Sequence, residues 1–395
     1  HIIQNGMAYM VFPSMRHSRF EHSLGTYHIA SKMVDNIEKT TVSGIDKEQI
    51  KELALYHDIG HFPFSHTFEY AIEVLEDLNK GIYDRIVRLT GYNEIKVFKQ
   101  LHEAMGIRIL KEMGKDDLAK LMESVYLKSA TGSEDVSVKI ARLIINSELD
   151  ADRLDYLQRD SYYSGAKFGI IDPERLLTTM KITTDGYVFP PKAVDDLEHF
   201  FLARFHMYSS VYNHPVIEIY NRILAYFIAF AINESLLDVP NNLEEFTDFT
   251  DEKVYLALLK VKNNDKFSHF YEALFKRIRY IRALIEGDVA RTLLKILSTN
   301  EKTKRDFYNF VLSYNGKVVI GRSELTTEIN NIFIERKMGT VSYRNPLSNE
   351  IGLPKLPERH RVYIGVYDKK IKDEVSKYFN EVFGINIQSA FKSNT

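Results

Sequence analysis

Apolar residues recur at helical spacing along most of the chain. One apolar stripe runs through residues 29–37, and a second runs through 101–113 and is closed by Gly114. The segment 197–235 is apolar over much of its length and predicts one or two helices. From residue 23 to about 310 the pattern is therefore that of a mostly α-helical protein.

Strand patterns interrupt the helical pattern in two places. Residues 181–189 alternate around an Asp-Gly turn and predict a β-hairpin. After about residue 315 the pattern predicts strands at 318–320 and 361–367, followed by a closing amphipathic helix at 370–383. These segments predict a small α+β lobe at the end of the chain.

We therefore expect a mostly α fold in three parts. These are a helical core over 1–235 with one short β-hairpin, a helical extension over 236–315, and a small C-terminal α+β lobe over 316–395. The chain starts at His1 inside what reads as a motif, so we expect that the N-terminal part of the core is incomplete. The longest apolar run, 223–232, is about half the ~20 residues of a membrane span, so we expect no membrane segment.

Charge and cysteine content exclude several classes of function. Lys and Arg total 52 against 54 Asp and Glu, for a net charge of −2, so nucleic acid is not an expected partner. The absence of cysteine excludes disulfides, iron–sulfur clusters, thiolate zinc sites and cysteine nucleophiles. A reducing cytoplasm is the simplest location for such a chain. Any bound metal must be held by His, Asp, Glu or backbone oxygen.

Histidines crowd into the N-terminal quarter, where seven of the 13 lie between His17 and His102. The densest segment contains the adjacent His57 and Asp58, and it is flanked in sequence by His22 and Asp152. Two imidazoles and two carboxylates suit Mn, Fe, Mg, Zn, Co or Ni, so the donor types alone do not name the metal. Without a cation, burying this set together would be costly.

Three longer motifs carry a resemblance to a known family. They are RFEHSLG at 19–25, HDIGHFPFSH at 57–66 and DRLDY at 152–156. Their order resembles the H…HD…D pattern of the HD-domain phosphohydrolase superfamily. The full strings resemble the SAMHD1-like deoxynucleoside triphosphate triphosphohydrolases (dNTPases), which are related to dGTPases. The resemblance covers about residues 4 to 235 and implies an HD-domain helical body.

The resemblance implies a role for each motif residue. One divalent metal ion per site would be held by His22, His57, Asp58 and Asp152. The catalytic and triphosphate-facing histidines would be His102, His61 and His66. Phosphate would be neutralised by Arg19, Arg153 and Arg204, and the sugar would be contacted by Gln4, Tyr156, Asp160 and Tyr212. A further Mg ion could accompany the substrate phosphates.

The implied reaction is hydrolysis of a deoxynucleoside triphosphate (dNTP) to deoxynucleoside and inorganic triphosphate by water attack at the α-phosphate. Asn5 departs from the family pattern, in which an apolar residue presses on the sugar. The alternatives are therefore another nucleotide substrate, such as an NTP, (p)ppGpp, a cyclic nucleotide or a nucleoside monophosphate, or a non-catalytic nucleotide-binding regulator. The family also implies a homo-oligomer, a dimer or tetramer. The need for a nucleotide activator stays open.

Some of these residues have a plainer interpretation. Asp155 and Arg159 are spaced as an ordinary i,i+4 helix pair. Glu21 and Glu103 either orient imidazoles or are structural. The aromatic region 200–232 is either an interface between copies or a buried core helix.

Overall fold

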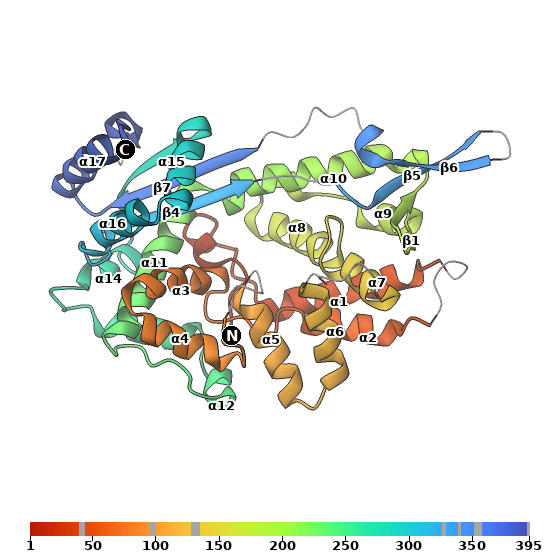
Figure 1. The fold of residues 1–395 in the computed structure, drawn as a ribbon, viewed down its shortest axis with the longest axis horizontal. Coiled ribbons are helices and arrows are strands. Elements are labelled where there is room, and N and C mark those ends of the chain that lie inside the picture. Colours follow the sequence, from red (N-terminus) through yellow and green to blue (C-terminus); the bar gives the residue numbers. More distant parts are fainter. Residues whose placement is uncertain are drawn as a thin grey trace.

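The computed structural model describes residues 1–38, 44–94, 100–127, 135–325, 329–338, 341–350 and 358–392. Helices dominate this part of the chain, and strands gather along one side of the helical body (Figure 1). The mostly α class with small sheets is confirmed.

The N-terminal helices build the body around the predicted metal ligands. They are the short 3-10 helix η1 (Gly6–Met10) and α1 (Arg19–Asp35), α2 (Lys47–Tyr56), α3 (His66–Leu78), α4 (Lys80–Leu89), α5 (Leu101–Glu112), α6 (Asp116–Tyr126), α7 (Val136–Ile145), α8 (Ala151–Ser164), α9 (Pro173–Thr179), α10 (Val194–Met207) and α11 (Pro215–Asn233). A π-helical turn, η5 (Tyr208–Tyr212), joins α10 to α11. The predicted apolar region 197–235 therefore spans two helices and this turn.

The later helices cover the extension and the lobe. They are α12 (Leu243–Thr247), α13 (Asp251–Lys260), α14 (Ser268–Leu274), α15 (Gly287–Thr299), α16 (Glu301–Leu312) and α17 (Lys369–Phe383). The last of these confirms the predicted closing helix. The strands are β1 (Lys181–Thr183), β2 (Gly186–Phe189), β3 (Ile281–Glu286), β4 (Val318–Leu325), β5 (Ile332–Met338), β6 (Val341–Pro346), β7 (Arg359–Val366) and β8 (Phe391–Lys392).

Two helices that carry predicted ligands have well-defined starts. Ser18 caps α1 in a reciprocal capping box with Glu21. Asp150 caps α8 by accepting the backbone N–H of Arg153 at 2.8 Å. These caps fix the first turn of each helix, and those turns carry His22 and Asp152.

Helix α11 lies in the core of the protein. It is long and apolar enough to cross a membrane by length and composition alone, but 83% of its apolar window is buried inside the structure. It packs mainly against α3 and also against β4. The segment 215–233 is therefore a core helix, which favours the second of the two interpretations of the region 200–232.

The strands form two four-stranded sheets. One has the order β4-β7-β3-β8 and is antiparallel throughout. The other has the order β1-β2-β5-β6, in which the predicted hairpin β1–β2 pairs in parallel with β5, with Tyr187 opposite Ile332. The segment 236–315, expected as a helical extension, also contains the strand β3, which pairs with β7. The β5–β6 hairpin was not predicted either.

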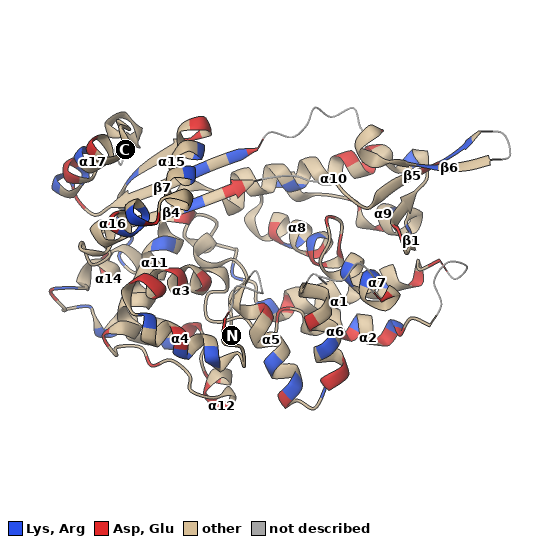
Figure 2. Cartoon of the chain, viewed as in Figure 1, with Lys and Arg blue, Asp and Glu red and all other residues tan. Residues whose placement is uncertain are grey.

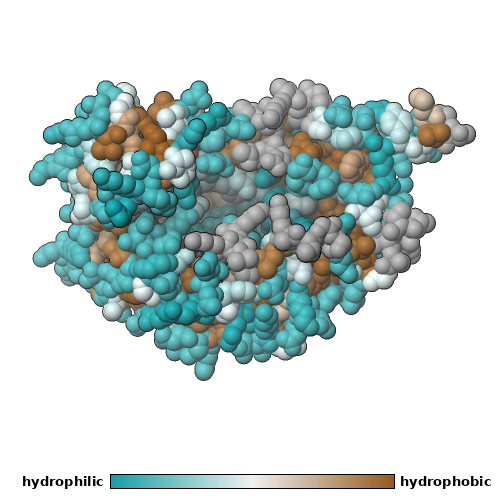
Figure 3. Space-filling view, in the orientation of Figure 1, coloured by the Kyte–Doolittle hydropathy of each residue, from teal (hydrophilic) through white to brown (hydrophobic). Residues whose placement is uncertain are grey.

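The buried side chains form two large clusters. One packs α3 and α11 against the sheet β4-β7-β3-β8, and the other packs α1, α2 and α5–α8 against α10. Acidic and basic residues are interspersed along the elements in Figure 2, and the face in Figure 3 is mainly hydrophilic.

Candidate metal centre

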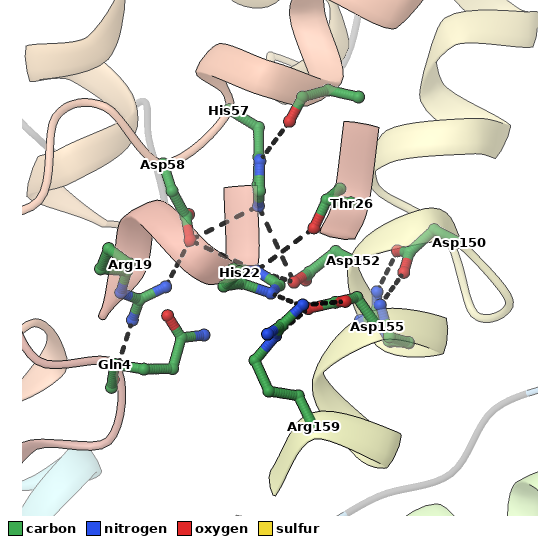
Figure 4. Close-up of polar contacts among 12 residues, drawn as sticks. Gln4, Arg19, His22, Thr26, His57, Asp58, Asp150, Asp152, Asp155 and Arg159 are labelled. Atoms are coloured by element: carbon green, nitrogen blue, oxygen red, sulfur yellow. Dashed lines mark hydrogen bonds and ion pairs between the residues drawn. The ribbon is translucent and has the colours of Figure 1, made fainter. Parts of the chain in front are cut away.

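The structure brings together all four predicted metal ligands. Nε2 of His22 lies 2.9 Å from Oδ1 of Asp152 and 3.6 Å from Oδ2 of Asp58. Nε2 of His57 lies 3.4 Å from Oδ2 of Asp58 and 3.8 Å from Oδ1 of Asp152 (Figure 4). The four side chains come from α1, from the end of α2 and from α8. A group of two imidazoles and a carboxylate with this spacing can hold one metal ion.

The hydrogen bonds on the far side of each imidazole fit a cation at the centre. His57 donates from Nδ1 to the Ala54 carbonyl at 2.8 Å, and His22 donates from Nδ1 to Asp155 at 2.7 Å. A neutral imidazole that donates from Nδ1 presents a lone pair at Nε2. Within the described residues, Nε2 of His57 has no hydrogen-bond partner although it is buried. These residues therefore fit a divalent metal.

The electrostatics of the protein chain point the same way. Burial lowers the pKa of His22, but Asp152 and Asp155 outweigh burial and raise it to about 10. Burial raises the pKa of Asp58, but Arg19, His57 and His61 together outweigh it, and the pKa stays well below its usual range. The carboxylates of the centre are therefore stabilised by nearby positive charge. A divalent cation would supply that charge and displace the protons that the imidazoles otherwise carry.

Asp155 does more than form the helix pair expected from its spacing. It binds Nδ1 of His22 and also accepts both Nε and Nη2 of Arg159 at 2.8 Å. The helices approach so closely that a Cβ on Gly25 would lie 1.8 Å from Oδ1 of Asp155. Gly25 in the first motif is therefore required by the packing of α1 on α8.

A second group of histidines stands beside the metal centre. His61 and His102 stack with ring centroids 3.8 Å apart, and the His66 ring lies 5.1 Å from His61. Burial lowers the pKa of His61 well below its usual range and lowers that of His66 to about 4. Both rings are therefore neutral near pH 7, and they can donate or accept hydrogen bonds without carrying charge.

Glu69, which was not predicted from the sequence, orients the His102 ring of this group. Its Oε1 accepts a hydrogen bond from Nδ1 of His102 at 3.0 Å. Its two oxygens also accept the backbone N–H groups of Leu101 and His102 at the start of α5. The only signal in the sequence was the spacing of Glu69, one helical turn after His66.

Asp160 is the centre of the predicted sugar-binding end. It accepts hydrogen bonds from Asn5, His17 and Tyr212, each at 2.7 Å. Gln4, the residue before Asn5, is buried, and its Oε1 has no hydrogen-bond partner in the described part of the chain. The polar Asn5, which departs from the family pattern, is thus tied directly to Asp160.

The predicted arginines are placed differently from one another. Arg19 forms an ion pair with Asp58 and donates from Nε to Ser65 at 2.9 Å. Arg153 is paired with Asp150, the cap of its own helix. Arg204 lies with its guanidinium 5.3 Å from the ring centre of Tyr208. Glu21 and Glu103 close capping boxes at the starts of α1 and α5, which is the structural role considered for them.

One cavity of about 690 Å³ connects these groups. Among the predicted residues it is lined by Gln4, Arg19, His57, Asp58, His66, His102, Asp152, Arg153, Tyr156, Asp160 and Tyr212. His22 and His61 are buried directly behind this wall. Metal ligands, histidines and sugar-side residues therefore face one shared space of the size of a small-molecule site.

Two family models match this chain. The HD-domain model matches residues 19–160, which contain all four metal ligands, and the model of the HD-associated region matches residues 171–394. The chain belongs to the HD-domain family. HD domains bind divalent metals, and in this chain His22, His57, Asp58 and Asp152 are grouped so that they could hold one such ion.

Individual relatives agree with this assignment. An uncharacterized protein of Methanocaldococcus jannaschii is 34% identical over 269 residues, covering 67% of this chain and 49% of its own. The deoxynucleoside triphosphate triphosphohydrolase SAMHD1 homolog of Dictyostelium discoideum is 30% identical over 252 residues, covering 62% and 46%. The chain spans about half the length of these curated relatives.

A solved structure shows the same fold. A phosphohydrolase from Bacteroides thetaiotaomicron matches with a TM-score of 0.66 at 23% identity, covering 92% of this HD-domain protein and 91% of that chain. The coverage of both chains shows that most of the fold is shared, and not only one part of it.

Proposed function

We propose that this protein hydrolyses dNTPs to deoxynucleoside and inorganic triphosphate. The observation that carries the proposal is that one cavity is lined by metal ligands, by His66 and His102, and by the sugar-side residues. Nε2 of His61 lies 3.4 Å from Oδ1 of Asp58, and Asp152, Tyr156 and Asp160 follow one another at intervals of four residues along α8. A nucleotide with its α-phosphate at the metal would reach both groups at once.

The metal would be held by His22, His57, Asp58 and Asp152, and Mg could also accompany the phosphates. A divalent ion there supplies Lewis acidity and lowers the pKa of a coordinated water from 15.7 to roughly 7. The protein's own cations neutralise phosphate, with Arg19 nearest to the ligands and Arg153 on the cavity wall. Arg204 would act from behind Tyr208.

His102 is the residue best placed to move a proton. Glu69 holds its Nδ1, which leaves Nε2 to exchange a proton with the leaving 5′ oxygen. The neutral His61 and His66 would hydrogen-bond to phosphate oxygens. Asp160, Tyr212, Tyr156 and Gln4 would position the sugar by its hydroxyl groups and its lower face.

Asn5 favours a second candidate, in which the substrate includes ribonucleotides. Its amide donates to Asp160 in the sugar-side group, so a polar group stands where an apolar one would exclude a 2′-hydroxyl. The other nucleotides handled by HD phosphohydrolases, (p)ppGpp, cyclic nucleotides and nucleoside monophosphates, belong to this alternative. A non-catalytic regulator would bind these nucleotides without turnover.

Product analysis distinguishes these candidates. The protein is incubated with Mn²⁺ or Mg²⁺ and with each dNTP and NTP, singly and in mixtures, and the products are separated by chromatography. Inorganic triphosphate and deoxynucleoside support the proposal, and release of orthophosphate contradicts it. Turnover only in mixtures would identify a nucleotide activator. The Asp152→Ala variant should lose turnover, whereas for a non-catalytic regulator it would change little.

We further propose that the protein is cytoplasmic and forms a homo-oligomer, a dimer or tetramer. The absence of cysteine and the burial of the apolar helix α11 support the first statement. Exposed apolar side chains on α1 and at the end of α8, among them Phe20 and Tyr162, support the second. Light scattering of the purified chain measures the oligomeric state directly.

A further inference from the structure

A strained turn lies between two of the phosphate-side histidines. Phe64 and Ser65 have φ angles of 58° and 56°, although neither is glycine. Backbone strain in this region persists only where surrounding contacts hold the residues in place. The turn sets the direction in which α3 starts, because His66 is the first residue of that helix.

The contact that holds this turn comes from a distant part of the chain. Oδ1 of Asp251, the first residue of α13, accepts the backbone N–H of Phe64 at 2.7 Å across 187 residues of sequence. The Phe64 ring also packs edge-on against Tyr255, one turn further along α13, with ring centroids 5.2 Å apart. Phe64 is fully buried.

The other oxygen of the same carboxylate reaches the N-terminal segment. Oδ2 of Asp251 accepts the backbone N–H of Ile3 at 2.8 Å. Ile3 in turn accepts the Ser65 hydroxyl at 2.6 Å, and Ser65 accepts Nε of Arg19. One buried carboxylate thus joins the turn before His66, the residue before Gln4 and, through Ser65, the guanidinium that pairs with Asp58.

We propose that Asp251 is a positioning residue for phosphate and sugar binding. It lies in the HD-associated region and outside the HD-domain match. It contacts none of the metal ligands and does not itself line the cavity, although its partner Phe64 does, so it acts through Phe64 and Ile3 on the positions of His66 and Gln4. The inference rests on the phosphate-side role proposed for His61 and His66 and extends it to a second region of the fold.

The decisive variants are Asp251→Asn and Asp251→Ala, with Glu252→Gln as the matched control. Alanine removes both acceptors, whereas the asparagine oxygen still accepts one N–H and its amide repels the other. Glu252 is the exposed next residue of the same helix, so its variant removes one negative charge without touching the turn. All are made in the full chain.

We expect inorganic tripolyphosphate binding, measured by calorimetry in Mn²⁺, to weaken about 10- to 100-fold in Asp251→Ala and less in Asp251→Asn. The kcat/KM for nucleotides should fall in the same order, while metal content and Glu252→Gln stay at wild-type values. Amide exchange should accelerate in peptides covering 60–68 and 1–8 in Asp251→Asn, which tests the inference even if Asp251→Ala does not fold.

Two results would overturn the inference. One is unchanged tripolyphosphate affinity and kcat/KM, within about twofold, in a variant that only melts earlier. The other is faster exchange confined to peptides of α13, because Asp251 would then stabilise its own helix alone. If the wild-type protein bound no tripolyphosphate, the proposed function would fail, whereas the exchange measurement would still report on the contact.

Discussion

The carboxylate of Glu69 accepts two hydrogen bonds from His102, from the imidazole Nδ1 and from the backbone N–H, and a third from the backbone N–H of Leu101. Burial raises the pKa of Glu69, but the hydrogen bond and charge of His102 outweigh it, so the net pKa is lowered and the group is an anion at neutral pH. A carboxylate in this position fixes both the tautomer and the direction of the ring.

We predict that Glu69→Gln lowers kcat about 100-fold, because the amide cannot accept all three donors and leaves His102 misdirected. The KM should change less, since phosphate contacts remain. Steady-state kinetics with the best nucleotide of the panel measures both values. Glu112→Gln, at the exposed end of α5, is the control and should behave as wild type. An equal kcat in both variants would argue against the assigned role of His102.

Asp155→Asn should weaken metal binding about 10- to 100-fold, because Asp155 holds Nδ1 of the ligand His22. Metal content after dialysis against graded chelator gives the affinity. Asp117→Asn removes a charge from an exposed position on α6 and serves as the control. If the variant retained metal at wild-type affinity, the role of Asp155 would be limited to its helix ion pair with Arg159.

Asn5→Leu should raise the preference for deoxynucleotides, because it removes the polar group tied to Asp160 in the sugar-side group. We expect the ratio of kcat/KM for a dNTP over the matching NTP to increase about 10-fold. The ratio cancels any general loss of activity. No change in the ratio would show that the 2′ position of the sugar does not face Asn5.

His269 should make the folded state less stable in mild acid. Burial, aided by Lys317, lowers its pKa to about 4, so the folded chain keeps it neutral where the unfolded chain, with a pKa near 6.5, binds a proton. Stability is therefore lost as the pH falls from about 6.5 towards 4, with a cost of about 2 kcal/mol at pH 5. Urea unfolding at pH 7 and pH 5 measures this loss.

The His269→Phe variant should lose correspondingly less stability between these two pH values, since a phenyl ring fits among Phe270 and Tyr367 without titrating. His206→Phe, at an exposed position, controls for the removal of a histidine. An identical pH dependence in wild type and His269→Phe would assign the acid sensitivity to other groups.

The sequence predicted the site residues that lie within recognisable motifs. It missed the residues whose role depends on contacts between segments far apart in the chain. His57 and Asp58 are adjacent, and the motifs around His22 and Asp152 are long enough to identify the family. Glu69 and Asp251 carry no such signal, because a carboxylate in the first turn of a helix is equally an ordinary partner for the helix dipole. Only the fold shows which backbone amides they accept.

The fold was predictable to a similar extent. The β1–β2 hairpin and the strands β4 and β7 have clear alternation or turn residues. The segment 281–286 follows a run rich in arginine and joins directly to a helix, so its pattern is ambiguous between helix and strand. Strands β5 and β6 carry many charged and polar residues, because one strand of that hairpin is almost entirely exposed.

The parallel pairing of β2 with β5 limits how this protein can be shortened. All four residues of β2 are buried, and their backbone partners on one side come from residues 332–334. A truncation before Ile332 would leave a hydrophobic strand with an unpaired edge, which recruits strands from other chains. Recombinant fragments that end between β2 and β5 should therefore collect in inclusion bodies, and useful deletions should start beyond the end of β5.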